Sequence, residues 1–206
     1  RDGPLQGLVQ GTATPFSPHP FRQLQVDLQG LDPAAWIAGA PRAELDVVAD
    51  LAPRGGDVPA IAGSFAVTNR AAGPFDRDRL PLARLAGQLL WREAGAELNG
   101  LRLAVPGGGS LRGEGRWGDG TLTLDLAAER LDAAALHGNL KPTRLAGPVS
   151  ARLGSARQEL ALDLVEPRFA MKASGARIGE RVQVEALGLQ AGAASLQAKG
   201  FLDLGQ

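Results

Sequence analysis

The residues of this chain that could do chemistry are few and lie far apart. The stretch Gly113-x-Gly115-x-x-Gly118 matches the letters of a dinucleotide-binding fingerprint, which requires a strand before it and a helix after it. The segment that follows, residues 121–126, alternates leucine with threonine and aspartate, which predicts a strand. We therefore interpret the glycines as a bend in a sheet followed by a turn, and not as a nucleotide site.

The sequence lacks some of the residues that a phosphate loop, a metal site or a catalytic nucleophile requires. The glycine-rich stretch 106–110 lacks the Gly-Lys-Ser/Thr end of a phosphate loop. His19 and His137 are the only histidines, and they lie far apart without a carboxylate cluster nearby. The chain contains no cysteine and no Gly-x-Ser-x-Gly elbow. We predict no catalytic residue, no metal site and no cofactor, and hence a protein that is not an enzyme.

The three tryptophans are the remaining candidates for direct ligand contact. Trp36, Trp91 and Trp117 could mark a binding surface, because indole rings offer a large apolar face with a polar tip. Trp91 lies in phase with Leu85 and Leu89 along one predicted strand. We interpret all three as packing residues.

The charge balance limits the possible partners. The 22 basic and 22 acidic residues are scattered and give a formal net charge of zero, so a nucleic-acid partner is not expected. No apolar run approaches the length of a membrane-spanning helix, and Arg1-Asp2-Gly3-Pro4 is no signal peptide. We expect this segment neither to target nor to anchor itself.

Strict alternation of apolar and polar residues dominates the chain. The apolar sets Leu101, Leu103 and Val105, then Leu122, Leu124 and Leu126, are separated by single residues that are mostly polar. This spacing puts one set on each face of a sheet and is typical of half-buried antiparallel strands. Gly118-Asp119-Gly120 lies between two such strands and predicts a hairpin turn.

Helix is expected only in short turns that belong to a repeat. Residues 31–36 and 131–136 each have the form apolar-Asp-x-x-x-apolar, with Asp32 and Asp132 as candidate N-caps. Residues 75–80 are a third copy. Each copy is followed by a strand that opens at Leu45, Leu85 or Leu145. Repeated units that cannot bury their own apolar face must stack on their neighbours, which predicts an extended object.

The order of several motifs resembles the interior of TamB proteins, which belong to the wider AsmA-like group. The motifs are Gly63-Ser64-Phe65-Ala66-Val67-Thr68-Asn69, Gly73-Pro74-Phe75-Asp76, the glycine-rich run 106–117, the hexad 131–136 and Lys141-Pro142-Thr143-Arg144-Leu145-Ala146-Gly147. The resemblance covers roughly residues 23–206 and no single motif is specific. We take residues 1–22 as a lead-in, and 23–206 as the repetitive segment with approximate units 31–74, 75–130 and 131–206.

The resemblance implies a fold and a function. The fold is all-β: an extended, strongly curved, mainly antiparallel sheet that forms a trough with an apolar interior, called a β-taco, with one or two short helical turns. TamB-like proteins are anchored in the inner membrane of Gram-negative bacteria and cross the periplasm. They work with the outer-membrane barrel TamA in outer-membrane protein assembly and in phospholipid transport between the membranes. The expected partners are phospholipid acyl chains, a TamA-like barrel through the full-length protein, and unfolded outer-membrane proteins.

Under this hypothesis the alternating apolar residues line a lipid groove. The candidates are Leu24, Val26, Leu28, Phe65, Val67, Leu101, Leu103, Val105, Leu122, Leu124, Leu126, Leu160, Leu162, Leu164, Phe169, Met171, Val182, Val184 and Leu196. The alternative is a scaffold that holds outer-membrane proteins by strand addition at a sheet edge, without conducting lipid. A surface adhesin or polysaccharide-acting solenoid would need a cluster of carboxylates and aromatic residues on one exposed face, and the sequence offers none. Alternation alone also leaves open whether two apolar faces meet in a closed sandwich.

Overall fold

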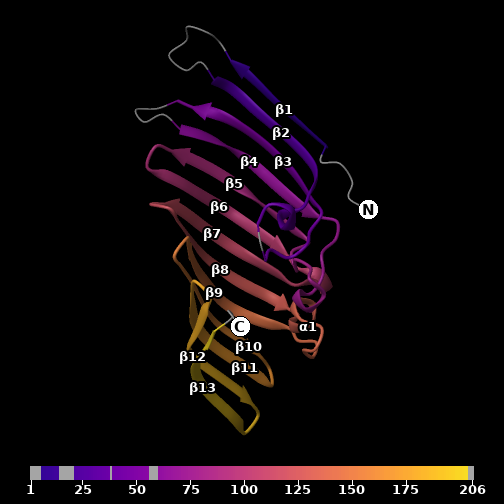
Figure 1. The fold of residues 1–206 in the computed structure, drawn as a ribbon, viewed down its shortest axis with the longest axis vertical. Coiled ribbons are helices and arrows are strands. Elements are labelled where there is room, and N and C mark those ends of the chain that lie inside the picture. Colours follow the sequence, from indigo (N-terminus) through magenta and orange to yellow (C-terminus); the bar gives the residue numbers. More distant parts are fainter. Residues whose placement is uncertain (1–5, 14–20, 38, 56–59, 204–206) are drawn as a thin grey trace.

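The chain forms one open β-sheet whose strands follow one another in sequence order (Figure 1). A computed structural model describes residues 6–13, 21–37, 39–55 and 60–203. The sheet has 13 strands, and each strand pairs antiparallel with the next. This confirms the all-β, antiparallel prediction. Because no second sheet covers the first among the described residues, the fold is not a closed sandwich.

The strands are similar in length. They are β1 (Gln6–Ala13), β2 (Phe21–Leu31), β3 (Leu45–Arg54), β4 (Ala60–Asn69), β5 (Arg84–Arg92), β6 (Gly95–Ala104), β7 (Ser110–Gly118), β8 (Thr121–Leu131), β9 (Leu145–Gly154), β10 (Arg157–Glu166), β11 (Phe169–Ile178), β12 (Arg181–Ala191) and β13 (Ala194–Asp203). The lead-in predicted at residues 1–22 contains β1, which pairs with β2 in the same sheet. His19 lies outside the described residues.

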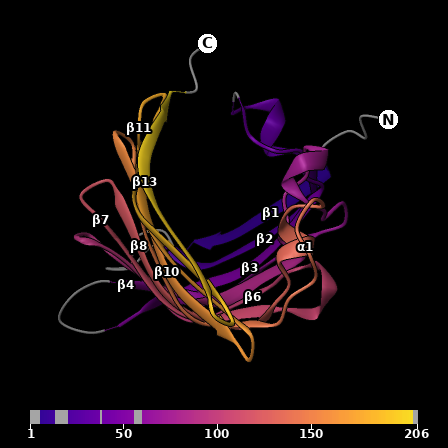
Figure 2. The same ribbon diagram turned by 90° about the horizontal axis from the view of Figure 1, so that it is seen from below.

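The sheet is bent into a trough (Figure 2). Two glycines show where the bend is tight: a Cβ atom at Gly63 would overlap the carbonyl of Asp50, and one at Gly113 would overlap that of Asp125. Both carbonyls belong to the neighbouring strand, so adjacent backbones converge on the side to which these glycines point. Glycine inside a strand marks such close approach because it has no side chain to displace.

The apolar side chains occupy the concave face. Gly63 and Gly113 lie in phase with the apolar set of their strands, so the backbones converge on the apolar side. Exposure agrees: Val47, on that side, is half-buried, whereas the adjacent Val48 points the other way and is 53% exposed. Side chains on the inside of a bend crowd and shield one another, whereas those on the outside spread apart. We call these two surfaces the concave face and the convex face.

Short helical turns lie along one edge of the trough and form what we call the helical rim. They are η1 (Pro33–Ala35), η2 (Phe75–Arg77) and α1 (Ala133–Leu136), in the β2–β3, β4–β5 and β8–β9 connections (Figure 2). A further turn, η3 (Pro106–Gly108), lies between β6 and β7. The sequence predicted one or two helical turns, at residues 31–36 and 131–136, so η2 and η3 are additional. The pattern missed η3 because positive φ angles of its glycines, 84° at Gly107 and 92° at Gly108, shape this turn without apolar alternation.

The aspartates of the first and last hexads cap their turns as predicted. Asp32 Oδ1 accepts hydrogen bonds from the amides of Ala34 (3.1 Å) and Ala43 (3.2 Å). Asp132 Oδ1 accepts the equivalent pair from Ala134 (3.0 Å) and Thr143 (3.0 Å). Each carboxylate therefore caps a helical turn and also fixes the chain that returns to the next strand.

The third hexad, residues 75–80, does not use its aspartate in this way. The N-cap of η2 is Pro74, and Asp76 lies inside the turn. The equivalent anchor is Asn69, which is 6% exposed and accepts hydrogen bonds at Oδ1 from the amides of Ala71 (3.0 Å) and Glu44 (3.1 Å). The hexad pattern did not predict this role for Asn69, because Asn69 stands six residues before the third hexad begins.

Replacement of Asp132 by alanine is expected to destabilise the chain by about 1 to 2 kcal/mol, because a helical turn loses its cap and the returning chain loses an anchor. Urea unfolding followed by circular dichroism measures the change. Asp125→Ala is the matched control, since Asp125 is exposed and points away from the concave face on β8. An equal loss in both variants would contradict the anchoring role.

Asp76 instead joins two turns of the helical rim. Its Oδ1 accepts a hydrogen bond of 2.7 Å from the amide of Gly138, just beyond α1. This bond lowers the pKa of Asp76 below its ordinary value, and the charges of His137 and Arg77 lower it further. His137, the C-cap of α1, places Nδ1 4.0 Å from Asp76 Oδ1.

The lowered pKa of Asp76 predicts a pH effect on stability. A carboxylate whose pKa is lower in the folded than in the unfolded state stabilises the fold above its unfolded pKa. That stabilisation is lost as the pH falls below about 4 towards the folded value. Asp76→Asn should therefore flatten the loss of stability between neutral pH and pH 3, measured by urea unfolding at several pH values. An unchanged pH profile in the variant would show that the ionisation of Asp76 does not contribute to the stability of the fold.

The fully enclosed core is small and lies beside α1. Its most buried side chains are Leu145 and Leu164, which are 2% and 1% exposed. They form a cluster with Val105, Ala128 and Leu131, against which Leu136 of α1 packs. The rest of the concave face is only half-buried, so most of its apolar surface has no second layer of described residues above it.

Candidate ligand groove

A single row of residues crosses the concave face from one end of the sheet to the other. It takes one residue from each strand and contains only apolar residues and glycine. The row, which we call the central row, is Gly11, Leu24, Leu51, Gly63, Leu89, Leu98, Gly115, Leu124, Ala151, Leu160, Gly175, Val184 and Gly200. With strands about 4.8 Å apart, it extends over about 58 Å.

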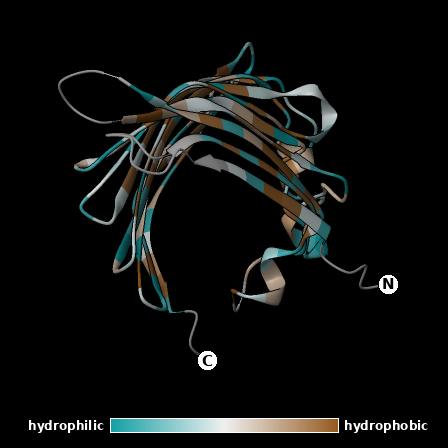
Figure 3. Cartoon of the chain, turned by 90° about the horizontal axis from the view of Figure 1, so that it is seen from above, coloured by the Kyte–Doolittle hydropathy of each residue, from teal (hydrophilic) through white to brown (hydrophobic). Residues whose placement is uncertain are grey.

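Rows on the helical-rim side of the central row are also apolar. One runs through Leu28, Val47, Val67, Leu85, Leu103, Leu111 and Ala128. Another runs through Leu101, Gly113, Leu126, Val149, Leu162, Ala173, Leu187 and Ala198. Figure 3 shows the resulting alternation of hydrophobic and hydrophilic residues along the strands.

The predicted groove residues lie on the concave face, but their side chains differ in how far they are exposed to a ligand in the trough. Leu101, Val105 and Leu164 are buried, at 3%, 7% and 1% exposure, so they support the surface without being open to a ligand. Leu160 and Leu196 are open, at 50% and 55% exposure. The other predicted residues are half-buried side chains of the same face.

Several residues of this face were missed from the sequence, and they are Val47, Leu51, Leu85, Leu89, Leu98, Leu111, Val149, Leu187 and Leu189. Irregular pairing explains two of them. The pairing register shifts between Leu98 and Leu101 and between Val184 and Leu187. At each shift the next residue on the concave face comes three positions later instead of two. A search that allows one such β-bulge per strand would have found them.

Two tryptophans lie on the edge of the concave face opposite the helical rim. The rings of Trp91 and Trp117 are 5.5 Å apart and inclined at 34°. They pack on each other, yet they remain 48% and 42% exposed. Their row also holds Gln158 and Arg177, which are polar. Trp36, at 67% exposure on the rim, does not take the packed position that Leu136 has in α1.

The convex face carries most of the charged residues, frequently in pairs of opposite sign across neighbouring strands. Lys172 lies 3.3 Å from Asp163, and Arg181 lies 2.7 Å from Asp203. The hydrogen bond from Arg181 holds the pKa of Asp203 below its ordinary value. These pairs are exposed, so they keep the outer surface soluble more than they stabilise the fold.

In the part of the chain that the structure describes, the chemical motifs of the sequence do not assemble into a site. Gly113, Gly115 and Gly118 lie in β7, and the segment that follows is β8, which excludes the dinucleotide interpretation. Across residues 6–13, 21–37, 39–55 and 60–203, no group of three or more histidine, cysteine, aspartate or glutamate side chains could hold a metal ion. Within the same ranges, no helix is long and apolar enough to span a membrane.

Comparison with known proteins does not identify the chain. No family model matches it, and no curated protein or solved structure is significantly similar to it.

Proposed function

We propose that this chain is an interior segment of a TamB-like protein whose trough holds phospholipid acyl chains during transport between two membranes. The central row supports this proposal: thirteen strands contribute one residue each, and none of the thirteen residues is polar. A hydrocarbon chain on this row meets an apolar contact at every strand and no charge.

The energy of acyl-chain burial suits such a path. Each buried methylene contributes about 0.8 kcal/mol, so a sixteen-carbon chain gains on the order of 12 kcal/mol when it leaves water. Movement along the trough requires this gain to be similar at successive positions. The repetition of leucine, valine, alanine and glycine from strand to strand supplies a nearly uniform surface.

Polar groups on the concave face are kept away from this path. Gln158 and Arg177 lie in the tryptophan-bearing row, two residues along their strands from the central row. A charge in the central row would have to be buried under the acyl chain without a partner, at a cost of several kcal/mol. The trough can therefore hold hydrocarbon at its centre and meet water at its tryptophan edge.

The wider context follows from the same resemblance and belongs to the same proposal. The full-length protein would be anchored in the inner membrane of a Gram-negative bacterium, cross the periplasm and meet a TamA-like barrel. Outer-membrane protein assembly would then be a second activity of the whole protein. The segment itself would contribute the hydrophobic path.

Charged substitutions in the trough should abolish lipid binding without unfolding the sheet. We expect Leu124→Arg and Leu162→Asp to lower the phospholipid bound per chain at least tenfold, because each places an unpaired charge under the acyl chain. Native mass spectrometry of the purified chain after incubation with phospholipid measures the bound fraction. Circular dichroism establishes that both variants keep their sheet.

The matched controls are Thr123→Arg and Ala161→Asp, which put the same charges on adjacent residues that point to the convex face. Both controls should bind lipid like the unmodified chain. Lipid binding that survives in folded Leu124→Arg and Leu162→Asp would contradict the proposal.

The alternative function is a strand-addition scaffold, which would act at the edge strands of a sheet. Among the described strands, β1 pairs only with β2, and β13 only with β12. Every residue of β13 is exposed. A protein of this kind would capture an extended peptide by backbone hydrogen bonds. Under this alternative, Gln197→Pro should block peptide capture and Leu124→Arg should leave peptide capture intact. Under the lipid-trough proposal, Leu124→Arg should abolish lipid binding and Gln197→Pro should leave lipid binding intact.

A further inference from the structure

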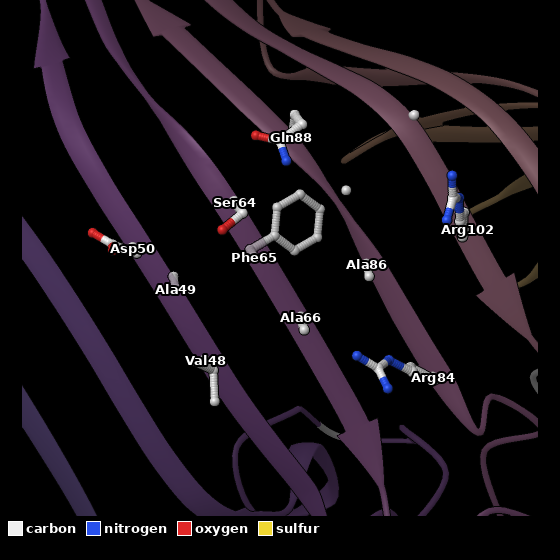
Figure 4. A pocket seen from close by; sticks show the side chains of 12 residues that line it. Val48, Ala49, Asp50, Ser64, Phe65, Ala66, Arg84, Ala86, Gln88 and Arg102 are labelled. Carbon is white, nitrogen blue, oxygen red and sulfur yellow. The ribbon is translucent and has the colours of Figure 1, made fainter.

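A hollow lies on the convex face, because most of its lining residues, among them Ala66, Ala86 and Arg102, have the phase opposite to the concave set. Figure 4 shows its lining side chains. The hollow has a volume of about 490 Å³ and spans β3 to β6. Its floor is formed by Ala66 and Ala86, which pair directly across β4 and β5. The same row continues to Val48 on one side and Arg102 on the other, so two short side chains stand between two longer ones.

Arginines stand at one end of this hollow. Arg84 pairs with Ala104, and Arg102 stands two residues before Ala104 on the same strand, so the two arginines are diagonal neighbours on one face. Side chains in this relation lie within reach of a common partner, above all when they are long. Both line the hollow, as Figure 4 shows.

No carboxylate of the described residues neutralises these arginines. Neither Arg84 nor Arg102 has a carboxylate of a described residue within 4.0 Å. Arg102 is paired directly across the sheet with Arg112, whose carboxylate contact is Glu129 at 3.6 Å. Like charges directly opposite each other on a sheet repel. The pairs Asp163 with Lys172 and Arg181 with Asp203 show the opposite arrangement on the same face.

Neutral polar groups and one carboxylate complete the hollow. Ser64 and Gln88 pair across β4 and β5 and offer hydroxyl and amide donors. Asp50 lies beyond Ser64 on β3 and accepts a hydrogen bond of 2.9 Å from Gln23. Asp50 therefore lies two strands from Arg84 and three strands from Arg102.

We propose that this hollow binds the phosphate group of a small phosphate ester. A phosphate dianion matches the charge of two guanidinium groups, and the planar guanidinium fork suits its oxygens. Ser64 and Gln88 would donate to the remaining oxygens, and Asp50 would accept from a hydroxyl or amine of the ester. The volume lies within the range of small-molecule sites. The site is independent of the trough and of its proposed lipid.

Titration of the isotope-labelled full chain, followed by nuclear magnetic resonance, tests the site. The probes are inorganic phosphate and glycerol 3-phosphate, each against sodium chloride of equal ionic strength. We expect saturable shifts at the Nε–H groups of Arg84 and Arg102 and at the amides of Ser64 and Gln88. The double variant Arg84→Gln/Arg102→Gln should weaken binding at least tenfold, whereas Arg116→Gln/Arg152→Gln, with the same change of charge on the same face, should alter it less than twofold.

A final experiment tests whether the phosphate group that binds belongs to a soluble ester or to a lipid headgroup. Vesicles of phosphatidylcholine with phosphatidic acid are compared with vesicles of phosphatidylcholine alone in a flotation assay. Binding of soluble esters, or binding to phosphatidic acid, supports the site when Arg84→Gln/Arg102→Gln abolishes it. Shifts that chloride reproduces, shifts that do not saturate, or equal binding by the two double variants would overturn the proposal.

Discussion

Replacement of Leu164 by alanine is expected to lower the free energy of unfolding by about 3 to 4 kcal/mol, because it opens a cavity in a site that cannot collapse. Leu164 is 1% exposed and lies in the cluster against which the helical turn α1 packs. This cluster contains the two most completely buried large side chains among the described residues. Urea unfolding followed by circular dichroism measures the loss.

Leu160→Ala is the matched control for this substitution. Leu160 is on the same strand and the same face, but it is 50% exposed and belongs to the open trough. Its truncation should cost less than about 1 kcal/mol, because much of the removed surface already faces water. Equal losses in the two variants would mean that the enclosed core does not lie beside α1.

Replacement of Gly113 by alanine is expected to destabilise the chain by about 3 kcal/mol, although it adds only one methyl group. The new Cβ would overlap the carbonyl of Asp125, which belongs to the backbone of β8 and cannot rotate away. The strands would have to separate or flatten at the bend, with the cost of an overpacked core. The change is measured by urea unfolding, and small-angle X-ray scattering reports any loss of curvature.

Gly188→Ala provides the comparison. At Gly188 in β12 the nearest atom to an added Cβ is the Lys172 carbonyl oxygen at 3.9 Å, which is an ordinary contact. The variant should be neutral or up to about 1 kcal/mol more stable, since alanine restricts the unfolded chain. If Gly113→Ala behaved in the same way, the bend would not depend on glycine.

Much of this fold was predictable because its main determinant is local. Alternation such as Leu122, Leu124 and Leu126 fixes which side chains share a face, and Asp119-Gly120 fixes a hairpin with φ angles of 50° and 70°. The capping roles of Asp32 and Asp132 were predictable for the same reason, since each bond spans two residues.

Features that depend on pairing between strands were not predictable from the pattern. The shift between Leu98 and Leu101 changes the phase of β6, and only its pairing with β5 and β7 reveals which residues join the central row. The anchoring role of Asn69 depends on the amide of Glu44, which is 25 residues away. The convex hollow likewise arises from alanines on two adjacent strands. Such features need the register of the sheet as well as the sequence.

The most direct test of a continuous oily path is residue-by-residue photocrosslinking to phospholipid along β8. A photoreactive amino acid is placed in turn at each position from Thr121 to Leu126, and crosslinked lipid is measured by mass spectrometry. The account predicts crosslinks at Leu122, Leu124 and Leu126 and little or none at Thr121, Thr123 and Asp125. Equal crosslinking at every position, or crosslinking confined to the convex positions, would contradict it.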